Sequence, residues 1–143
     1  MSISFDDRLP QEDEFWALFE TTGWNRQYRL SSQELFAAIS HSWYVISAFD
    51  DGRLVGFGRV VSDGVLHAMI YDLIVHPAHQ EKGIGGELLA RLVTSCQKVN
   101  IRDIQLFCAK GKQTFYERRG FRSRPSDSPG MEYVPKAKSH KVA

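Results

Sequence analysis

Three glycines and a lysine lie close together in the stretch QEKGIGG, residues 80–86. Glycine lets a ligand approach the backbone because no Cβ stands in the way, and Lys82 adds a positive charge. The pattern predicts a strand that ends at Val75 and a helix that begins near Gly83. The first amides of a helix have no partner within the helix and attract anions. We therefore expect this loop to bind a phosphate or a diphosphate.

Two known glycine-rich turns do not fit these residues. A dinucleotide-binding fingerprint that starts at Gly83 would need glycine or alanine at position 88, which is Leu88. No Gly-Lys-Ser/Thr follows, as a P-loop requires. A purely structural role, in which Gly85 and Gly86 only allow close packing of helix and strand, stays open.

The pattern of apolar residues predicts the elements that position the loop. Helical spacing recurs over residues 10–20 and again after Ser31 or Ser32, either of which can cap a helix. Strand-like runs with turn residues between them are expected at 43–49, 54–61 and 66–75. Further along we expect a helix over 86–100, a strand over 103–108, a helix over 113–119, and strands at 121–122 and 131–134. This is a mixed α/β order.

Composition limits the classes of protein. At 143 residues one domain is expected, over residues 1–134, with residues 135–143 as a basic, flexible tail. Eighteen basic against seventeen acidic side chains give a net charge of +1, which argues against a nucleic-acid partner. Neither a secretory signal nor a membrane-spanning run is recognisable, so we expect a cytoplasmic protein without a membrane partner. The two cysteines and five histidines lack metal-ligand spacing, so we expect no metal.

Two motifs carry a resemblance to a known family. The string QEKGIG resembles the Q/R-x-x-G-x-G/A signature of the GNAT superfamily of acetyl-CoA-dependent N-acetyltransferases. FYERRGF, residues 115–121, resembles the family's F-Y-x-x-x-G-F segment, and the expected element order is also that of the family. The chain thus looks like a small, single-domain, bacterial-type member. The resemblance implies a mostly antiparallel mixed sheet, flanked by helices and splayed between its fourth and fifth strands.

The resemblance also implies where acetyl-CoA binds. Backbone groups of Leu73, Ile74 and Val75 would contact pantetheine. The amides of the loop would bind the pyrophosphate, through Gln80, Glu81, Lys82, Gly83, Ile84, Gly85 and Gly86. Lys112 and Phe115 are further expected contacts. The chain departs from the family pattern at Ala109 and Lys112, where many relatives carry asparagine and alanine.

Acetyl transfer needs an acid for the departing thiolate and a neutral amine. Tyr116 is the expected acid, because a phenol stays protonated at neutral pH and the family's tyrosine at this position commonly faces the thiol. Asp72 lies in an apolar run, where burial without a partner would be costly, and it is expected to be a base, an amine anchor or a structural residue. Cys108 is a less favoured candidate for a covalent intermediate.

The acceptor is expected to be a primary amine of a small molecule, for example an aryl-alkyl amine. Four side chains are the expected lining of its site: Trp24, Tyr28, Met131 and Tyr133. Aromatic residues at such spacing are also typical of a core. Two other functions stay open, a catalytically silent acetyl-CoA sensor or interaction module and an acetyltransferase of proteins or peptides. We expect a monomer or a homodimer.

Overall fold

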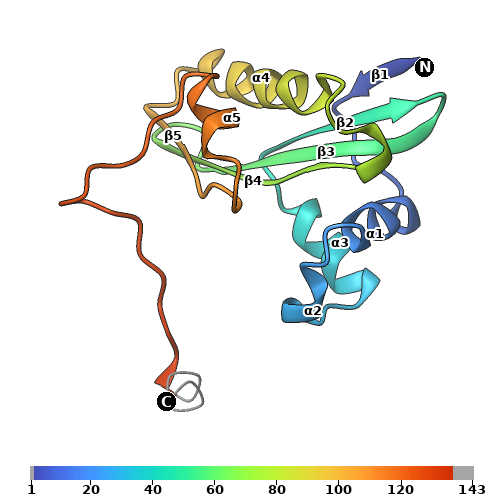
Figure 1. Ribbon diagram of the computed structural model, residues 1–143, viewed down its shortest axis with the longest axis horizontal. Helices are drawn as coiled ribbons and strands as arrows, with labels where there is room; N and C mark the ends of the chain where they lie inside the picture. Colours follow the sequence, from blue (N-terminus) through green and yellow to red (C-terminus); the bar gives the residue numbers. More distant parts are fainter. Residues whose placement is uncertain (1, 137–143) are drawn as a thin grey trace. The chain divides into compact units, whose positions relative to one another are not determined.

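The computed structural model describes residues 2–136, and Figure 1 traces the chain through them. The chain divides after Leu106 into two compact units. The first unit holds the whole sheet and the helices that flank it, and the second begins at Phe107. Within residues 2–136 no helix combines the length and the apolar character needed to cross a membrane.

The sheet has five strands in the order β1-β2-β3-β4-β5. Neighbours are antiparallel from β1 to β4, whereas β4 and β5 run parallel. The strand bounds are Ile3–Asp6 (β1), Tyr44–Asp50 (β2), Arg53–Ser62 (β3), His67–Val75 (β4) and Asp103–Leu106 (β5). Asp51 and Gly52, both with positive φ, form the turn between β2 and β3, where the sequence predicts turn residues. The predicted α/β fold class, with its mixed and mostly antiparallel sheet, is confirmed.

Helices cover both faces of this sheet (Figure 1). Helices α1 (Glu12–Glu20), α2 (Asn25–Tyr28) and α3 (Ser32–Ser40) lie on one side. The Phe15 ring of α1 contacts the Phe57 ring of β3 edge-on, with centroids 4.6 Å apart, and both side chains are fully buried. Burying one such side chain stabilises the fold by about 2 kcal/mol. Helix α4 (Ile84–Gln97) packs on the other face through Leu88, Leu89 and Leu92, all buried.

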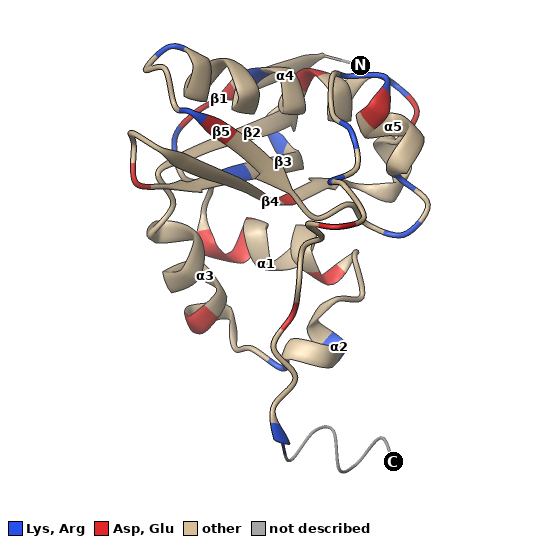
Figure 2. Cartoon of the chain, turned by 90° about the vertical axis from the view of Figure 1, so that its left-hand side faces the viewer, with Lys and Arg blue, Asp and Glu red and all other residues tan. Residues whose placement is uncertain are grey.

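The ends of these helices follow ordinary capping chemistry. The Ser31 hydroxyl accepts a hydrogen bond from the Glu34 amide, and the Glu34 carboxylate accepts one from the Ser31 amide, which is the capping box of α3. Figure 2 colours the acidic residues of α1 red; three of them lie in its first turn, where their charges suit the helix dipole. Helix α2 was not predicted. The Asn25 side-chain amide pairs with both backbone groups of Leu30 and closes this short helix.

The second unit contains α5 (Gln113–Glu117), as the sequence predicts. The two strands predicted at 121–122 and 131–134 are wrong, since neither segment pairs with another strand within residues 2–136. Pro125 and Pro129 lack backbone N–H groups, and Arg124 holds a turn by donating to the Ser128 carbonyl and hydroxyl. Most of the tail predicted over 135–143 lies outside the described residues.

Candidate functional site

Strand β4 has an open edge at its C-terminal half. It pairs with β5 only from His67↔Asp103 to Ile70↔Leu106, and then continues to Val75 without pairing with β5. On its other side the same half still pairs with β3, as far as Gly56↔Val75. Residues 71–75 therefore present backbone groups that β5 does not use, and an extended ligand can hydrogen-bond to such an edge. This is the predicted splay between the fourth and fifth strands.

A bulge shapes β4 beside this edge. The β3–β4 register shifts between Phe57 and Arg59, and Asp72 has a left-handed backbone with φ of 55°. The Asp72 carboxylate oxygen Oδ2 accepts a hydrogen bond from Arg59 Nε at 2.7 Å. Arg59 Nη1 also donates to the Ala38 carbonyl and the Ser42 hydroxyl, both at 3.3 Å. Arg59 thus joins the bulge to the C-terminal end of α3.

Arg59 is the positively charged partner that a largely buried carboxylate such as that of Asp72 needs. The two side chains are only 16% and 22% exposed, and a shielded carboxylate without a cation would be costly. Asp72 Oδ1 accepts no hydrogen bond from residues 2–136. Arg59 was not predicted as a site residue, although an arginine inside an otherwise apolar strand run is a signal for such a pair.

The glycine-rich loop leads into α4 without a side-chain cap. Gly83 is the N-cap residue, with φ of 83°, and having no side chain it leaves the first amides of α4 without a capping acceptor. These are the amides of Ile84, Gly85 and Gly86. The Ile84 side chain is buried, so only its backbone can contact a ligand. The predicted anion site therefore has the required local geometry: a helix N-terminus, glycines and the exposed Lys82.

Two contacts hold the segment between β4 and this loop. The short 3₁₀ helix η1 (Pro77–His79) ends with His79, whose Nε2 lies 2.8 Å from Asp50 Oδ2. This hydrogen bond lowers the pKa of the Asp50 carboxyl. The Gln80 side chain donates to the Val75 carbonyl at 3.1 Å and so ties the loop to the end of β4. The sequence analysis missed His79 and Asp50, which no local pattern connects.

The second unit places Tyr116 on α5 among aromatic rings. Its ring contacts those of Phe115 and Phe121 edge-on, with centroids 5.1 and 5.9 Å apart. Burial raises the pKa of Tyr116, with a smaller contribution from the charge of Cys108. The phenol therefore keeps its proton beyond its ordinary range, as an acid must. Lys112 is the exposed N-cap residue of the same helix.

The predicted acceptor residues do not form one cavity within either unit. The Trp24 ring packs edge-on against Phe19, at 5.9 Å between centroids, beside the core of the first unit. Tyr28 projects from α2 and is 59% exposed. Met131 and Tyr133 belong to the second unit and are exposed there. Packing thus accounts for Trp24, and the acceptor role of all four residues stays a prediction.

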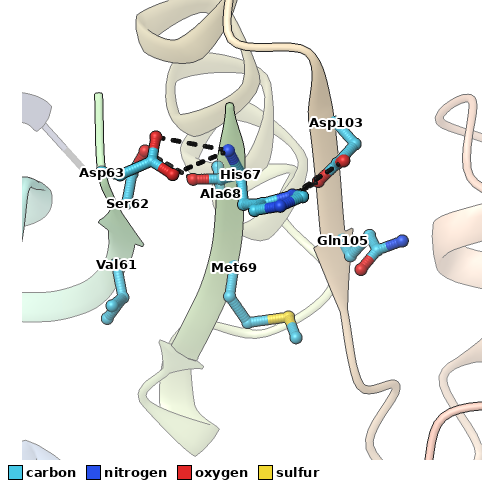
Figure 3. Close-up of a pocket in the computed structure, with 8 residues that line it drawn as sticks. All are labelled: Val61, Ser62, Asp63, His67, Ala68, Met69, Asp103 and Gln105. Carbon is cyan, nitrogen blue, oxygen red and sulfur yellow. Dashed lines mark hydrogen bonds and ion pairs between the residues drawn. The ribbon is translucent and has the colours of Figure 1, made fainter. Parts of the chain in front are cut away.

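A pocket of about 260 Å³ opens on β3, β4 and β5 (Figure 3). The sequence analysis did not find it, because its residues come from three strands. His67 of β4 lies across from Asp103 of β5, with Nδ1 at 3.0 and 2.9 Å from the two carboxylate oxygens. The hydrogen bond that the His67 ring donates to the Asp103 carboxylate, together with the charge of that carboxylate, raises the pKa of His67. Eight residues line the pocket: Val61, Ser62, Asp63, His67, Ala68, Met69, Asp103 and Gln105.

Comparison with known proteins gives this geometry a family. Residues 9–121 match the acetyltransferase (GNAT) family. The chain belongs to the GNAT acetyltransferases. The chain is thus an acyltransferase of a family that generally uses acetyl-CoA as its co-substrate. Among the residues that the structure describes, no group of three or more His, Cys, Asp or Glu side chains gathers as metal ligands would.

Relatives and solved structures of the GNAT family agree with this assignment. The histone acetyltransferase TAP1 of Glycine max is 30% identical over 83% of this chain and 55% of its own length. The chloroplastic GCN5-related N-acetyltransferase 1 of Arabidopsis thaliana is 35% identical over 62% of this chain and 45% of its own. This chain thus spans about half the length of either relative. A GNAT family acetyltransferase from Streptococcus pneumoniae shares its fold at a TM-score of 0.80 and 25% identity, over 94% of this chain and 99% of that one.

Proposed function

We propose that the protein transfers the acetyl group of acetyl-CoA to the primary amine of a small molecule, by direct attack in a ternary complex. The observation that carries the proposal is the open edge of β4 over residues 71–75, which precedes a loop whose helix amides have no cap. In the proposed complex the pantetheine arm pairs with the backbone of Leu73–Val75. The pyrophosphate then meets the amides of residues 80–86.

Each step of the transfer has a candidate residue. The neutral amine attacks the thioester carbonyl carbon, and a β4 backbone N–H stabilises the oxygen as it gains charge. The carbon–nitrogen bond forms, the carbon–sulfur bond breaks, and the electron pair passes to sulfur. Tyr116 protonates that sulfur, and the proton lost by the amine returns to the tyrosinate through water. The proposal requires the Tyr116 hydroxyl to reach the thiol.

Asp72 is proposed as the anchor of the amine. Its Oδ2 is occupied by Arg59, which supports a role for Oδ1 as a fixed hydrogen-bond acceptor. The Arg59 contacts with Ala38 and Ser42 hold that carboxylate in place. An acceptor amine that donates to Oδ1 would be oriented towards the thioester, and orientation of this kind is a large part of catalysis.

A protein or peptide lysine is the second candidate acceptor. The name of the soybean relative, a histone acetyltransferase, favours it. The near-neutral net charge of +1 also fits either acceptor. The proposed location is the cytoplasm, although the Arabidopsis relative is named as chloroplastic. A monomer or a homodimer is proposed.

Release of free thiol from acetyl-CoA tests the proposal. The full chain is assayed with a panel of small primary amines and with lysine-containing peptides. We expect amine-dependent release, and we expect Tyr116→Phe to lower kcat on the order of 100-fold while the affinity for coenzyme A is kept. Release with peptides alone would favour the second candidate. The proposal fails if no amine of either kind increases thiol release.

A further inference from the structure

The pocket on β3, β4 and β5 begins where the two parallel strands part. The last pair of the β4–β5 ladder is Ile70↔Leu106, and the pair before it is Met69↔Gln105. Met69 and Gln105 both line the pocket. His67↔Asp103 lies two residues further along the strands. At roughly 3.3 Å per residue, the pocket extends about 7 Å from the Met69 pair to the His67 pair.

The floor of the pocket shares a face with the proposed site of transfer. Ala68 and Ile70 are buried, so the alternating His67, Met69 and Tyr71 lie on the opposite face of β4. Arg59 pairs with Tyr71 in the β3–β4 ladder and stands 5.8 Å from its ring centroid. Met69 and Val61 supply an apolar surface between the Arg59–Asp72 ion pair and His67.

The polar groups at the far end are not equally available to a ligand. Asp63 is already engaged, because its Oδ1 accepts from the amides of Val65 and Leu66 at 2.7 and 2.6 Å. The Ser62 hydroxyl donates to the His67 carbonyl. The Gln105 side chain has no hydrogen-bond partner among residues 2–136 and lines the same pocket (Figure 3).

His67 is therefore the cationic group that this pocket offers. Its Nδ1 is bound to Asp103, which leaves Nε2 for a ligand. The charged groups that face it are Asp103 of β5 and Asp63 of the β3–β4 turn, and both raise its pKa. A protonated imidazole has an N–H donor at each nitrogen, so Nε2 can donate to an oxygen. Hydrogen bonds with a charged partner are the stronger kind.

We propose that this pocket binds the body of the acceptor and selects a primary amine with an apolar linker and a carboxylate or hydroxyl oxygen at its far end. The amine lies at the splay near Asp72, the linker crosses Met69, and the oxygen accepts from His67 Nε2. The inference rests on the proposed function and assigns its substrate class.

Matched acceptor pairs test this selection. The kcat/KM values for 6-aminohexanoate and tyramine are compared with those for hexylamine and phenethylamine, which lack the oxygen. We expect about a tenfold preference for each oxygen-bearing acceptor, carried by KM, since one charged hydrogen bond contributes about 1.5 kcal/mol. The preference for 6-aminohexanoate should fall as the pH rises through the pKa of His67, where the imidazole loses its charge.

Two variants locate the preference. His67→Gln removes the cation and Asp103→Asn removes its partner, and each should reduce the preference for 6-aminohexanoate to about threefold or less. His41→Gln, at the exposed histidine that is the C-cap residue of α3, is the matched control and should keep the full preference. Thermal unfolding shows whether each variant is folded.

The possible outcomes distinguish a failure of the pocket assignment from a failure of the proposed function. Equal kcat/KM values within the pairs would overturn the pocket assignment, and turnover of hexylamine would leave the proposed function standing. A preference that survives in both folded variants would overturn it as well, because the selecting group would lie elsewhere. If none of the four amines is acetylated while other amines of the panel are, the pocket assignment fails alone. If no amine of the panel and no peptide increases thiol release, the proposed function fails and the inference fails with it.

Discussion

Arg59 and Asp72 form an ion pair between β3 and β4 at the point where β4 bulges. The left-handed backbone of Asp72 is unusual for a residue other than glycine, and such conformations persist where surrounding contacts hold them. Here the contacts are those of one guanidinium, which reaches Asp72 and two groups near the end of α3. Arg59 is thus a positioning residue for the bulge.

Replacement of Arg59 by methionine tests that role. Arg59→Met leaves a shielded carboxylate without its cation, and we expect a loss of about 2 kcal/mol in the free energy of unfolding. The KM for acetyl-CoA should rise as well, because the β4 bulge loses its support. Urea unfolding and steady-state kinetics measure the two effects. The double variant Arg59→Met/Asp72→Asn should recover part of the stability, since it no longer buries an unpaired charge.

The control for this prediction is Arg8→Met. Arg8 pairs with Asp6 on the surface, where its side chain is 85% exposed, so its loss should change the free energy of unfolding by about 0.5 kcal/mol. If Arg59→Met were as stable as the unchanged protein, or Arg8→Met were equally damaging, the positioning role would be wrong.

Single residues were predicted unevenly from the sequence. Asp72 was recognisable because a carboxylate in an apolar run requires a partner. Arg59 was not identified as that partner, since it lies on another strand and the bulge that brings the two together leaves no local pattern. His67 and Asp103 escaped for the same reason, because they are 36 residues apart in sequence.

Helix α4 and strand β3 approach each other closely, and two glycines allow it. A Cβ at Gly58 would lie 2.7 Å from Leu92 Cδ1, and one at Gly56 would lie 2.9 Å from Leu88 Cδ1. Contacts this short force a neighbour to move. Because α4 begins at the proposed phosphate site, its packing against the sheet determines the position of the loop amides.

Gly58→Ala should therefore destabilise the fold by about 2 kcal/mol through overpacking. Leu92→Val removes the clashing methyl group and should cost about 1 kcal/mol alone. The double variant should lose about 1 kcal/mol less stability than the sum of the two single losses, because the new methyl group then has room. Urea unfolding of all four proteins provides the measurement. Strict additivity would mean that α4 does not seat against Gly58.

The elements whose apolar residues recur with a regular period were the ones that the sequence predicted. The apolar stripes of α1, α3 and α4 and the strand-like runs of β2, β3 and β4 predicted these elements close to their bounds, whereas α2 was not predicted. The segment after Gly120 contains no strand, because Phe121 and Met131–Val134 are strand-like residues that have no strand to pair with among residues 2–136. A strand needs a partner, and residue type alone does not supply one.

On the scale of the whole molecule, one sheet carries both proposed sites. The open C-terminal half of β4 and the amides of α4 suit an extended, doubly charged ligand. The start of β4 and β5 suits a small amine with a polar end. The family match over residues 9–121 extends across both compact units, as expected if both contribute to one enzyme.

Calorimetric titration of the full chain with coenzyme A, and separately with pantetheine, tests the central claim most directly. If the amides of residues 80–86 hold the pyrophosphate, coenzyme A binds at micromolar concentrations. Pantetheine, which lacks the phosphates, then binds on the order of 100-fold more weakly. Equal affinity for the two ligands, or no heat with coenzyme A at millimolar concentrations, would contradict the account.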